Sequence, residues 1–324
     1  MTKYSKKSQG KSNDYFTVAF YNLENLFDTH DDEHTDDDSF LPFSERRWTI
    51  KRYRKKLRKL GYTISQIGIK STRKPPVLVG LAEVENKLVI DDLIDSKFLK
   101  DKSYDFVHYD SPDERGIDTA LLYDTNHFEV LKSDIYSVEL FNDSGSRDHT
   151  RDILYVFGRF NDEPMHVLVN HWPSRREGVR ESEHKRITAS NKLIEVIQKI
   201  KQDDPNAKIL AMGDFNDDPS CASMKQLVHY LDLHNPMEAL LSYSRGSLNH
   251  RFKWNLFDQI VFTTNFFEYA QERHSFSRAE IFDKLFLKQF KGKYKGNPFR
   301  TYVGSRYKGG YSDHFPVYLL LKRG

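Results

Sequence analysis

Hydrophobic residues in this chain form short continuous runs, and polar residues directly follow many of them. Eight runs, each three to five residues long, are rich in Val, Ile, Leu, Phe and Tyr. Continuous apolar runs of this length are typical of strands that are buried on both faces. The predicted strands are residues 16–20, 77–81, 119–123, 153–157, 166–169, 209–212, 260–262 and 317–321.

Longer segments show the spacing of amphipathic helices. In residues 46–68, apolar residues recur at alternating intervals of three and four, which places them on one face of a helix. Residues 181–200 show the same stripe less regularly, and shorter helices are predicted near 88–99 and 222–232. Because strands buried on both faces need covering layers, these elements together predict a layered α/β or α+β sandwich.

Length and composition allow one large domain or two small ones. The chain has 324 residues, of which 38% are hydrophobic and 14% aromatic, and its net charge of +3 says little about partners. Candidate chemical motifs begin near residue 22 and end near residue 313, so a single site would need both ends of the chain. No Pro/Gly/Ser-rich linker or internal repeat intervenes. We therefore predict one domain, residues 14–324, after a disordered tail of residues 1–13.

Targeting signals are absent from the sequence as far as its pattern shows. The polar residues 1–13 lack the apolar core of a secretory signal, and no apolar stretch approaches the roughly 20 residues of a membrane span. The single cysteine, Cys221, excludes an internal disulfide framework and fits a reducing compartment. We expect a cytoplasmic, monomeric protein without a membrane span.

Six polar motifs stand at or beside the ends of apolar runs. They supply carboxylates, carboxamides and histidines, the groups that a hard divalent cation and a phosphate need. Each motif alone has an ordinary explanation, because Asp and Asn favour turns after strands. The motifs are Asn-Leu-Glu-Asn at 22–25, Ala-Glu-Val-Glu-Asn at 82–86, Asn-His-Trp at 170–172, Gly-Asp-Phe-Asn-Asp at 213–217, Phe-Asp-Gln at 257–259 and Ser-Asp-His at 312–314.

Local spacing already assigns chemistry to some of these residues. Asp214 and Asn216 are two apart in an extended segment, so their side chains project the same way. One of them can activate a water while the other holds a phosphate oxygen. Asp313 and His314 open a strand and can divide their contacts between a metal and a phosphate. Glu83 follows a buried strand, where a charge must be paired or bind a metal.

The order and company of the six motifs resemble the endonuclease/exonuclease/phosphatase superfamily. These are metal-dependent phosphoesterases related to pancreatic deoxyribonuclease and the apurinic endonucleases, and the resemblance covers about residues 15–322. Further stretches resemble an under-characterised bacterial branch whose substrates are poorly defined. The resemblance implies a four-layer sandwich of two packed, mostly antiparallel sheets with helices outside. Deoxyribonuclease-like members often have Gln before the metal-binding Glu, where this chain has Ala82.

The resemblance also implies roles for individual residues. Glu83 would be the principal ligand of Mg²⁺ or Mn²⁺, His314 would contact the phosphate, and Asp258 would pair with the second nitrogen of His314. Whether Asp214 or the Asp258–His314 pair removes the proton of the attacking water stays open. The implied catalytic residues are His171, Asp214, Asn216, Asp258 and His314, and the implied metal ligands are Glu83, Asn22 and Asp313.

Other polar residues are candidates for supporting roles. Four arginines could grip substrate phosphates, because a guanidinium matches phosphate bidentately, although surface arginines are common. Three further residues lie next to the motifs or before a buried strand, and strand alternation puts Glu85 on the same face as Glu83. The arginines are Arg115, Arg175, Arg300 and Arg306, and the three supporting candidates are Glu85, Asn170 and Asp118.

Two charge runs stand out. Residues 46–60 hold nine Lys or Arg, which we interpret as the solvated outer face of a packed helix in preference to a nucleic-acid contact. Residues 28–38 form an acidic stretch without the spacing and glycine of an EF-hand, which we interpret as a solvated loop. Near the mouth of a site, such a loop would repel polyanions.

The predicted function is hydrolysis of phosphodiester bonds by a divalent-metal-dependent phosphoesterase, with a nuclease as the first choice and nucleic acid as its partner. A phosphomonoesterase acting on sugar or inositol phosphates is the alternative, and a sphingomyelinase-like phosphodiesterase comes third. A binding module that has kept the fold ranks last. The oxygen-rich ligand set, without H-E-x-x-H spacing, favours Mg²⁺ or Mn²⁺ over Zn²⁺.

Overall fold

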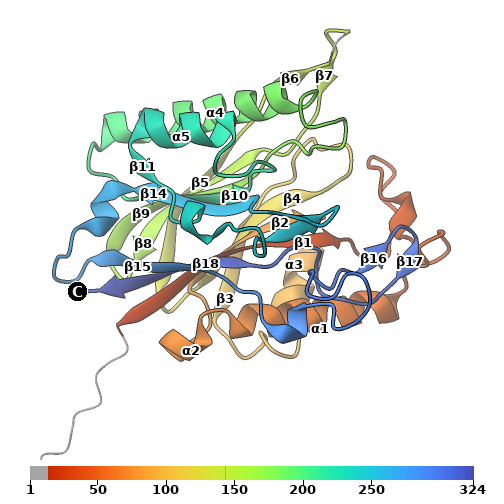
Figure 1. The fold of residues 1–324 in the computed structure, drawn as a ribbon. Helices are drawn as coiled ribbons and strands as arrows, with labels where there is room; N and C mark the ends of the chain where they lie inside the picture. The colour runs from red at the N-terminus through yellow and green to blue at the C-terminus, as the bar shows by residue number, and fades with distance from the viewer. Residues whose placement is uncertain (1–13, 143) are drawn as a thin grey trace, which may run out of the picture.

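Two six-stranded β-sheets lie face to face in the computed structural model, which describes residues 14–142 and 144–324 (Figure 1). The tail predicted at residues 1–13 lies outside the described residues. In strand order, the first sheet contains β15 (His274–Ile281), β18 (Val317–Arg323), β1 (Tyr15–Leu26), β2 (Leu78–Val84), β4 (Asp118–Asp124) and β3 (Tyr104–His108). The second contains β11 (Leu233–His234), β14 (Asp258–Thr263), β10 (Ile209–Asp214), β9 (Glu163–His171), β8 (Ile153–Phe160) and β5 (Phe128–Tyr136).

Both sheets are mixed and share one pattern of strand directions. Only the pairs β1–β2 and β9–β10 are parallel, and every other neighbouring pair in the two sheets is antiparallel. All eight predicted strands are confirmed, and each lies within or overlaps a strand of these sheets. The prediction of mostly antiparallel sheets packed together is likewise confirmed.

Helices cover the outer faces of the sandwich. In Figure 1, α1 (Ile50–Gln66) and α3 (Lys87–Ile94) cover the first sheet, while α4 (Glu183–Asp203) and α5 (Ala222–Leu231) cover the second. The four predicted helices are therefore present, although α1 is shorter than the helix predicted over residues 46–68. The short elements are α2 (Ile69–Thr72), η1 (Asp38–Phe40), η2 (Glu238–Leu240), η3 (Thr264–Phe267), η4 (Leu285–Leu287), β6 (Leu140–Phe141), β7 (Arg147–Asp148), β12 (Leu248–His250), β13 (Lys253–Asn255), β16 (Tyr302–Val303) and β17 (Arg306–Tyr307).

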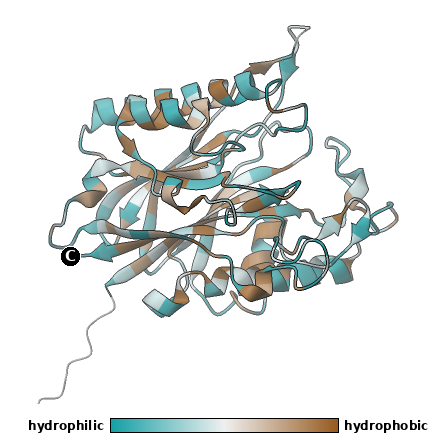
Figure 2. Cartoon of the chain, in the orientation of Figure 1, coloured by the Kyte–Doolittle hydropathy of each residue, from teal (hydrophilic) through white to brown (hydrophobic). Residues whose placement is uncertain are grey.

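The core consists of two buried clusters. The larger lies between the sheets and under α1 and α3, and the smaller joins α4 and α5 to the outer face of the second sheet. Figure 2 shows the corresponding change between hydrophobic and hydrophilic residues along α4. The sheets approach closely at Gly80, where a Cβ atom would lie 2.6 Å from the sulfur of Met212. None of the helices in the described part of the chain is long and apolar enough to span a membrane.

This topology collects strand ends at one edge of the sandwich. In the second sheet, Asp214 at the end of β10 pairs with Asp258 at the start of β14 and with His171 at the end of β9. In the first sheet, β1 and β2 end where β18 and β4 begin. A hydrogen bond between Asn22 and Asp214 joins the two edges. Five of the six sequence motifs thus lie at strand ends or strand starts on the edge where the sheets meet. The sixth, the Ser-Asp-His motif, lies on the same edge just before β18.

Candidate active site

Asp214 occupies the centre of this edge and is almost completely buried. Its Oδ2 accepts a hydrogen bond from Asn22 Nδ2 at 3.0 Å, and its Oδ1 accepts one from the backbone N–H of Asn216 at 2.9 Å. Burial and the negative charge of Asp258 raise the pKa of Asp214 to about 6, against the lowering effects of the His314 charge and of the hydrogen bonds from Asn216 and Asn22. The carboxylate can therefore take up a proton near neutral pH, as a general base must.

The ring of His314 lies close to the carboxylate of Asp214. Its Nδ1 lies 2.7 Å from Oδ2 of the buried Asp258, and its Nε2 lies 3.9 Å from Oδ2 of Asp214. Burial lowers the pKa of His314, but the charge and hydrogen bond of Asp258 outweigh burial and hold this pKa well above its usual value. This shift favours the protonated ring, in which Nε2 is a donor. The loop is fixed by Ser312, whose Oγ donates to the carbonyl oxygen of Asn22 at 2.7 Å.

The pKa of His171 shifts in the opposite direction to that of His314. Its Nε2 lies 3.9 Å from Asp214 Oδ2, and its Nδ1 is buried without a hydrogen-bond partner among the described residues. Burial and then the positive charges of Arg151 and Arg115 lower the pKa of His171 well below its usual value. Asp214 Oδ2 thus lies 3.9 Å from two imidazoles, one with a lowered pKa and one with a raised pKa.

The turn after β10 holds Asn216 in a left-handed conformation, with φ of 50°. Its Nδ2 donates to the carbonyl oxygen of Trp172 at 2.9 Å. Arg175 supports the same turn, because it donates to the carbonyl oxygen of Asn216 at 2.7 Å and to Asp217 Oδ1 at 2.6 Å. Its guanidinium also lies over the ring of Phe257. Arg175 therefore braces the turn and does not extend toward open substrate space.

Asn170 also acts within the protein. Its Oδ1 accepts a hydrogen bond from the indole nitrogen of Trp172 at 3.2 Å, and its side chain is fully buried. The facing residue on β10 is Gly213, where a Cβ would lie 2.3 Å from the carbonyl oxygen of Asn170. The glycine of the Gly-Asp-Phe-Asn motif therefore lets β9 and β10 approach and brings His171 beside Asp214.

Left-handed residues reshape the ends of β1 and β2. Glu24, Asn25 and Glu83 have φ of 54°, 52° and 61°, and both strand registers shift at these points. Glu83 Oε2 accepts the backbone N–H of Asn25 at 2.7 Å, and Asn22 Oδ1 accepts that of Glu24 at 2.9 Å. Strained backbone of this kind persists only where surrounding contacts hold it, and it is typical of functional sites.

Asp313 lies in an ionic cluster on the same edge. Arg300 Nη2 is 2.8 Å from Asp313 Oδ2, and Arg300 Nε is 3.4 Å from Glu24 Oε1. Behind them, the buried Lys56 donates to the carbonyl oxygen of Glu24 and to Thr301 Oγ1 at 2.8 Å. Sequence reasoning missed Glu24 and Lys56, and the interpretation of residues 46–60 as a solvated face is wrong for Lys56.

The three proposed metal ligands carry oxygen donors at neighbouring strand ends. Glu83, Asn22 and Asp313 fit a hard cation such as Mg²⁺ or Mn²⁺, which uses few protein carboxylates and keeps several waters. Among the described residues, two groups of His, Asp or Glu bring donor atoms within 4.8 Å of one another, and neither includes Glu83 or Asp313. These groups are Asp214, Asp258 and His314, and His108, Asp110 and Asp118.

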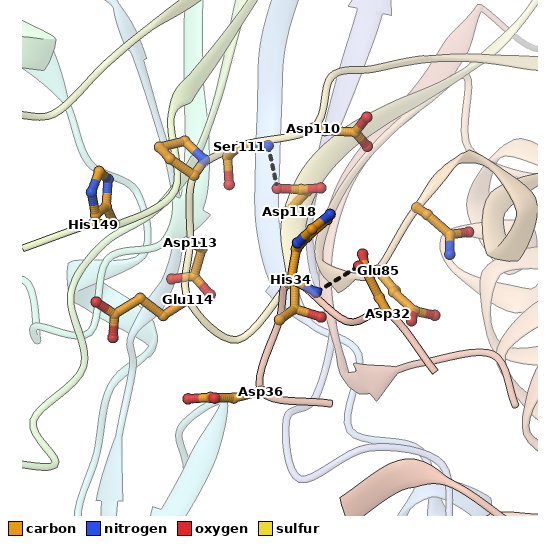
Figure 3. A pocket seen from close by; sticks show the side chains of 14 residues that line it. Asp32, His34, Asp36, Glu85, Asp110, Ser111, Asp113, Glu114, Asp118 and His149 are labelled. Carbon is orange, nitrogen blue, oxygen red and sulfur yellow. Dashed lines mark hydrogen bonds between the residues drawn. The ribbon is translucent and has the colours of Figure 1, made fainter. Parts of the chain in front are cut away.

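Asp110 and Asp118 of the second group line an acidic pocket beside the site (Figure 3). The pocket has a volume of about 740 Å³, and residues within 32–36 and 110–118 form much of its wall. Asp118 Oδ2 lies 3.1 Å from His108 Nε2, and Glu85 Oε2 accepts the backbone N–H of Asp28. Because positive φ at Glu83 breaks the strand alternation, Glu85 faces this pocket and does not share the face of Glu83. The residues 28–38 are thus a pocket wall and not only a solvated loop.

The remaining arginines occupy different environments. Arg115 separates the acidic pocket from the site, with Nη2 donating to Asn25 Oδ1 and lying 4.0 Å from Glu83 Oε2. Arg306 is exposed on β17, where its backbone pairs with Val303 and its side chain forms no hydrogen bond or ion pair with any described residue. Arg151, which the sequence did not single out, donates to the carbonyl oxygen of Trp172 at 2.7 Å and pairs with Asp113 at 2.9 Å.

Solved structures share this fold. An endonuclease/exonuclease/phosphatase family protein from Bacteroides thetaiotaomicron is 17% identical with a TM-score of 0.59, covering 96% of this chain and 95% of its own. A mannosyl-6-phosphatase from the same species is 16% identical with a TM-score of 0.58, covering 94% and 99%. D. rerio TDP2 complexed with single strand DNA product is 14% identical with a TM-score of 0.54, covering 95% and 99%.

A family model assigns the sequence itself to a family. The model described as Endonuclease/Exonuclease/phosphatase family matches residues 17–323, whereas comparison with curated proteins finds no match. The chain therefore belongs to the endonuclease/exonuclease/phosphatase family, whose members are metal-dependent phosphoesterases.

Proposed function

We propose that this family member hydrolyses phosphodiester bonds as a nuclease, with Mg²⁺ or Mn²⁺ as its cofactor. The observation that carries the proposal is the buried group around Asp214. Both carboxylate oxygens of Asp214 are fixed by hydrogen bonds, and a cationic His314 held by Asp258 faces it at 3.9 Å. A base beside a fixed donor is what water attack on a phosphate requires.

Each group then has a defined task. Asp214 orients the attacking water and accepts its proton, and its raised pKa suits that transfer. His314 donates from Nε2 to a phosphate oxygen, and His171 and Asn216 stabilise the charge that develops on the same group. Asp258 keeps the His314 ring oriented and charged. Glu83, Asn22 and Asp313 would hold the cation, which when bound supplies positive charge to a phosphate oxygen and the leaving oxygen.

The nuclease assignment has support from one structural neighbour. D. rerio TDP2, which shares the fold, is described in complex with single strand DNA product. A phosphomonoesterase acting on a sugar phosphate is the second candidate. The acidic pocket of about 740 Å³ favours it, because a pocket of this size holds a small ligand and its carboxylates can accept hydrogen bonds from sugar hydroxyls. The mannosyl-6-phosphatase that shares the fold supports this alternative.

Two chromogenic esters separate these functions. The wild-type protein should cleave bis-p-nitrophenyl phosphate faster than p-nitrophenyl phosphate with Mg²⁺ or Mn²⁺, and EDTA should abolish the reaction. Asp214→Ala and His314→Ala should each lower kcat by about 10²–10⁴-fold, the usual contribution of a proton-transfer group. Asp101→Ala, at an exposed turn, is the matched control and should not change the rate.

The outcomes are distinct. Faster cleavage of the monoester would replace the nuclease with the phosphatase. Near-wild-type rates in a folded Asp214→Ala variant, with an unchanged circular dichroism spectrum, would exclude the assigned role of Asp214.

A further inference from the structure

A basic and aromatic surface lies next to Asp313, and sequence reasoning did not single it out. We define it as the turn at residues 250–253, between β12 and β13, together with the segment 288–300. Residues 284–312 contain eight Lys or Arg and no Asp or Glu. Such a concentration of one charge attracts polyanions.

A small pocket connects this surface to the catalytic edge. Its volume is about 190 Å³, and both parts of the surface contribute to its wall together with Arg300 and Asp313. Pockets that enclose a complete small ligand have volumes of about 300–1,000 Å³. This pocket is therefore sized for one part of a larger substrate, such as a single ring, directly beside the residues proposed to act on phosphate.

Two exposed aromatic rings form the edge of the surface. Phe252 and Tyr294 stack with centroids 5.4 Å apart and planes only 5° apart, although 55% and 46% of their surfaces are exposed. The turn holds Arg251 and Phe252 at φ of 50° and 67°, which is strained for residues other than glycine. This backbone conformation thus exposes the ring of Phe252 to solvent, and packing in the core does not account for an aromatic residue at this position.

Lysines around these rings keep their charges available. Lys291, Lys293 and Lys295 are exposed, and no carboxylate among the described residues lies within ion-pair distance of them. Lys293 Nζ lies 4.9 Å from the centroid of Phe252. Aromatic faces combined with a positive groove are the features by which proteins bind single-stranded nucleic acid, since every base offers a face for stacking.

We propose that this surface binds the unpaired nucleotides next to the scissile phosphate, with a base stacked on Tyr294 and Phe252 and backbone phosphates held by the lysines. The inference rests on the proposed nuclease function and names its substrate as single-stranded. An anionic membrane would also attract lysines and exposed aromatic rings. The concave pocket that continues to Asp313 favours a strand, because a flat lipid surface would not enter it.

Binding without cleavage provides the test. The anisotropy of a fluorescein-labelled oligothymidylate is measured in EDTA with the full chain. Tyr294→Ala should weaken binding by about 5–150-fold, which corresponds to the loss of one stacked base. Tyr294→Phe should bind as the wild type does. Tyr230→Ala is the matched control, because Tyr230 is 71% exposed on α5 over the other sheet.

An oligomer of the same length with abasic sugars separates stacking from charge. The wild-type protein should prefer the base-bearing strand, and Tyr294→Ala should lose that preference. Replacing Lys291, Lys293 and Lys295 by Gln should reduce the slope of log K against log salt by about 0.7 for each of these lysines that binds a phosphate in the wild type.

Several results would overturn the proposal. Equal binding of oligothymidylate by Tyr294→Ala and the wild type would do so. Binding by the wild type to phosphatidylserine vesicles and not to the oligomer would also do so. A wild-type protein that binds the strand but cleaves neither the strand nor bis-p-nitrophenyl phosphate would contradict the nuclease function and leave this surface standing. Cleavage of the small diester without strand binding would contradict the surface alone.

Discussion

The two flanks of the proposed catalytic edge carry opposite charge. Along the first sheet, the strand order β18-β1-β2-β4 places Asn22, Glu83 and Asp118 on neighbouring strands, with Asp313 in the loop that precedes β18. The basic and aromatic surface lies beyond Asp313, and the segment 284–312, which includes most of it, contains eight Lys or Arg. The acidic pocket lies at the Asp118 end, next to residues 28–38 with seven Asp or Glu and no Lys or Arg.

The two flanks lie far enough apart for their charges to act separately. Three strand spacings of about 4.8 Å separate β18 from β4, or about 14 Å. This exceeds the Debye length of about 8 Å at physiological ionic strength, so each flank acts on a different part of the substrate. A polyanion is then attracted on one side of the scissile phosphate and repelled on the other. We expect the strand to extend over the basic side and to be cut near its end.

The largest expected effect tests what both flanks share. Asp258→Asn removes the charge that holds His314 protonated and should lower kcat by about 10²–10⁴-fold. Because Asp258 lies in the centre, oligothymidylate and bis-p-nitrophenyl phosphate should lose the same factor, measured by steady-state kinetics. A loss confined to the oligomer would place Asp258 in strand binding and break the division between centre and flanks.

The sequence predicted the centre of the sheets better than their edges. The eight apolar runs correspond to the eight inner strands, because those are covered on both faces. The strands it missed are β3, β15, β5 and β11, which are the four edge strands of the two large sheets. Edge strands face solvent on one side and lack a neighbour, so their residues do not form continuous apolar runs.

The same limit applies to the site. The structure brings together Asn22, Asp214, Asp258 and His314, whose short motifs the sequence displays. The buried contact of Lys56 with Glu24 joins segments far apart in the chain and has no local signal. The position of Glu85 depended on strand alternation, which the left-handed backbone at Glu83 interrupts.

Neutralising the acidic flank should produce an intermediate effect. Asp32→Asn combined with Asp36→Asn removes two exposed charges from the pocket wall. Each exposed charge contributes at most about 1 kcal/mol in water, so cleavage of circular single-stranded DNA, which has no end, should rise several-fold. Cleavage of bis-p-nitrophenyl phosphate should stay constant. Asp101→Asn is the control, and an unchanged ratio of circular to linear cleavage would contradict the repelling role of this flank.

The smallest expected effect concerns Arg306, at the outer side of the basic flank. Its side chain is exposed on β17, so Arg306→Gln removes one screened charge and leaves the packing of the folded protein intact. Binding of oligothymidylate at low salt should weaken by about 1.4- to five-fold, as expected for an exposed ion pair worth about 0.2–1 kcal/mol. The difference should vanish at high salt. Arg175→Gln should instead slow cleavage of every substrate, because Arg175 braces the turn of Asn216. If Arg306→Gln and Arg175→Gln had the same effects on binding and on cleavage, the proposed division between a charged flank and a catalytic centre would be wrong.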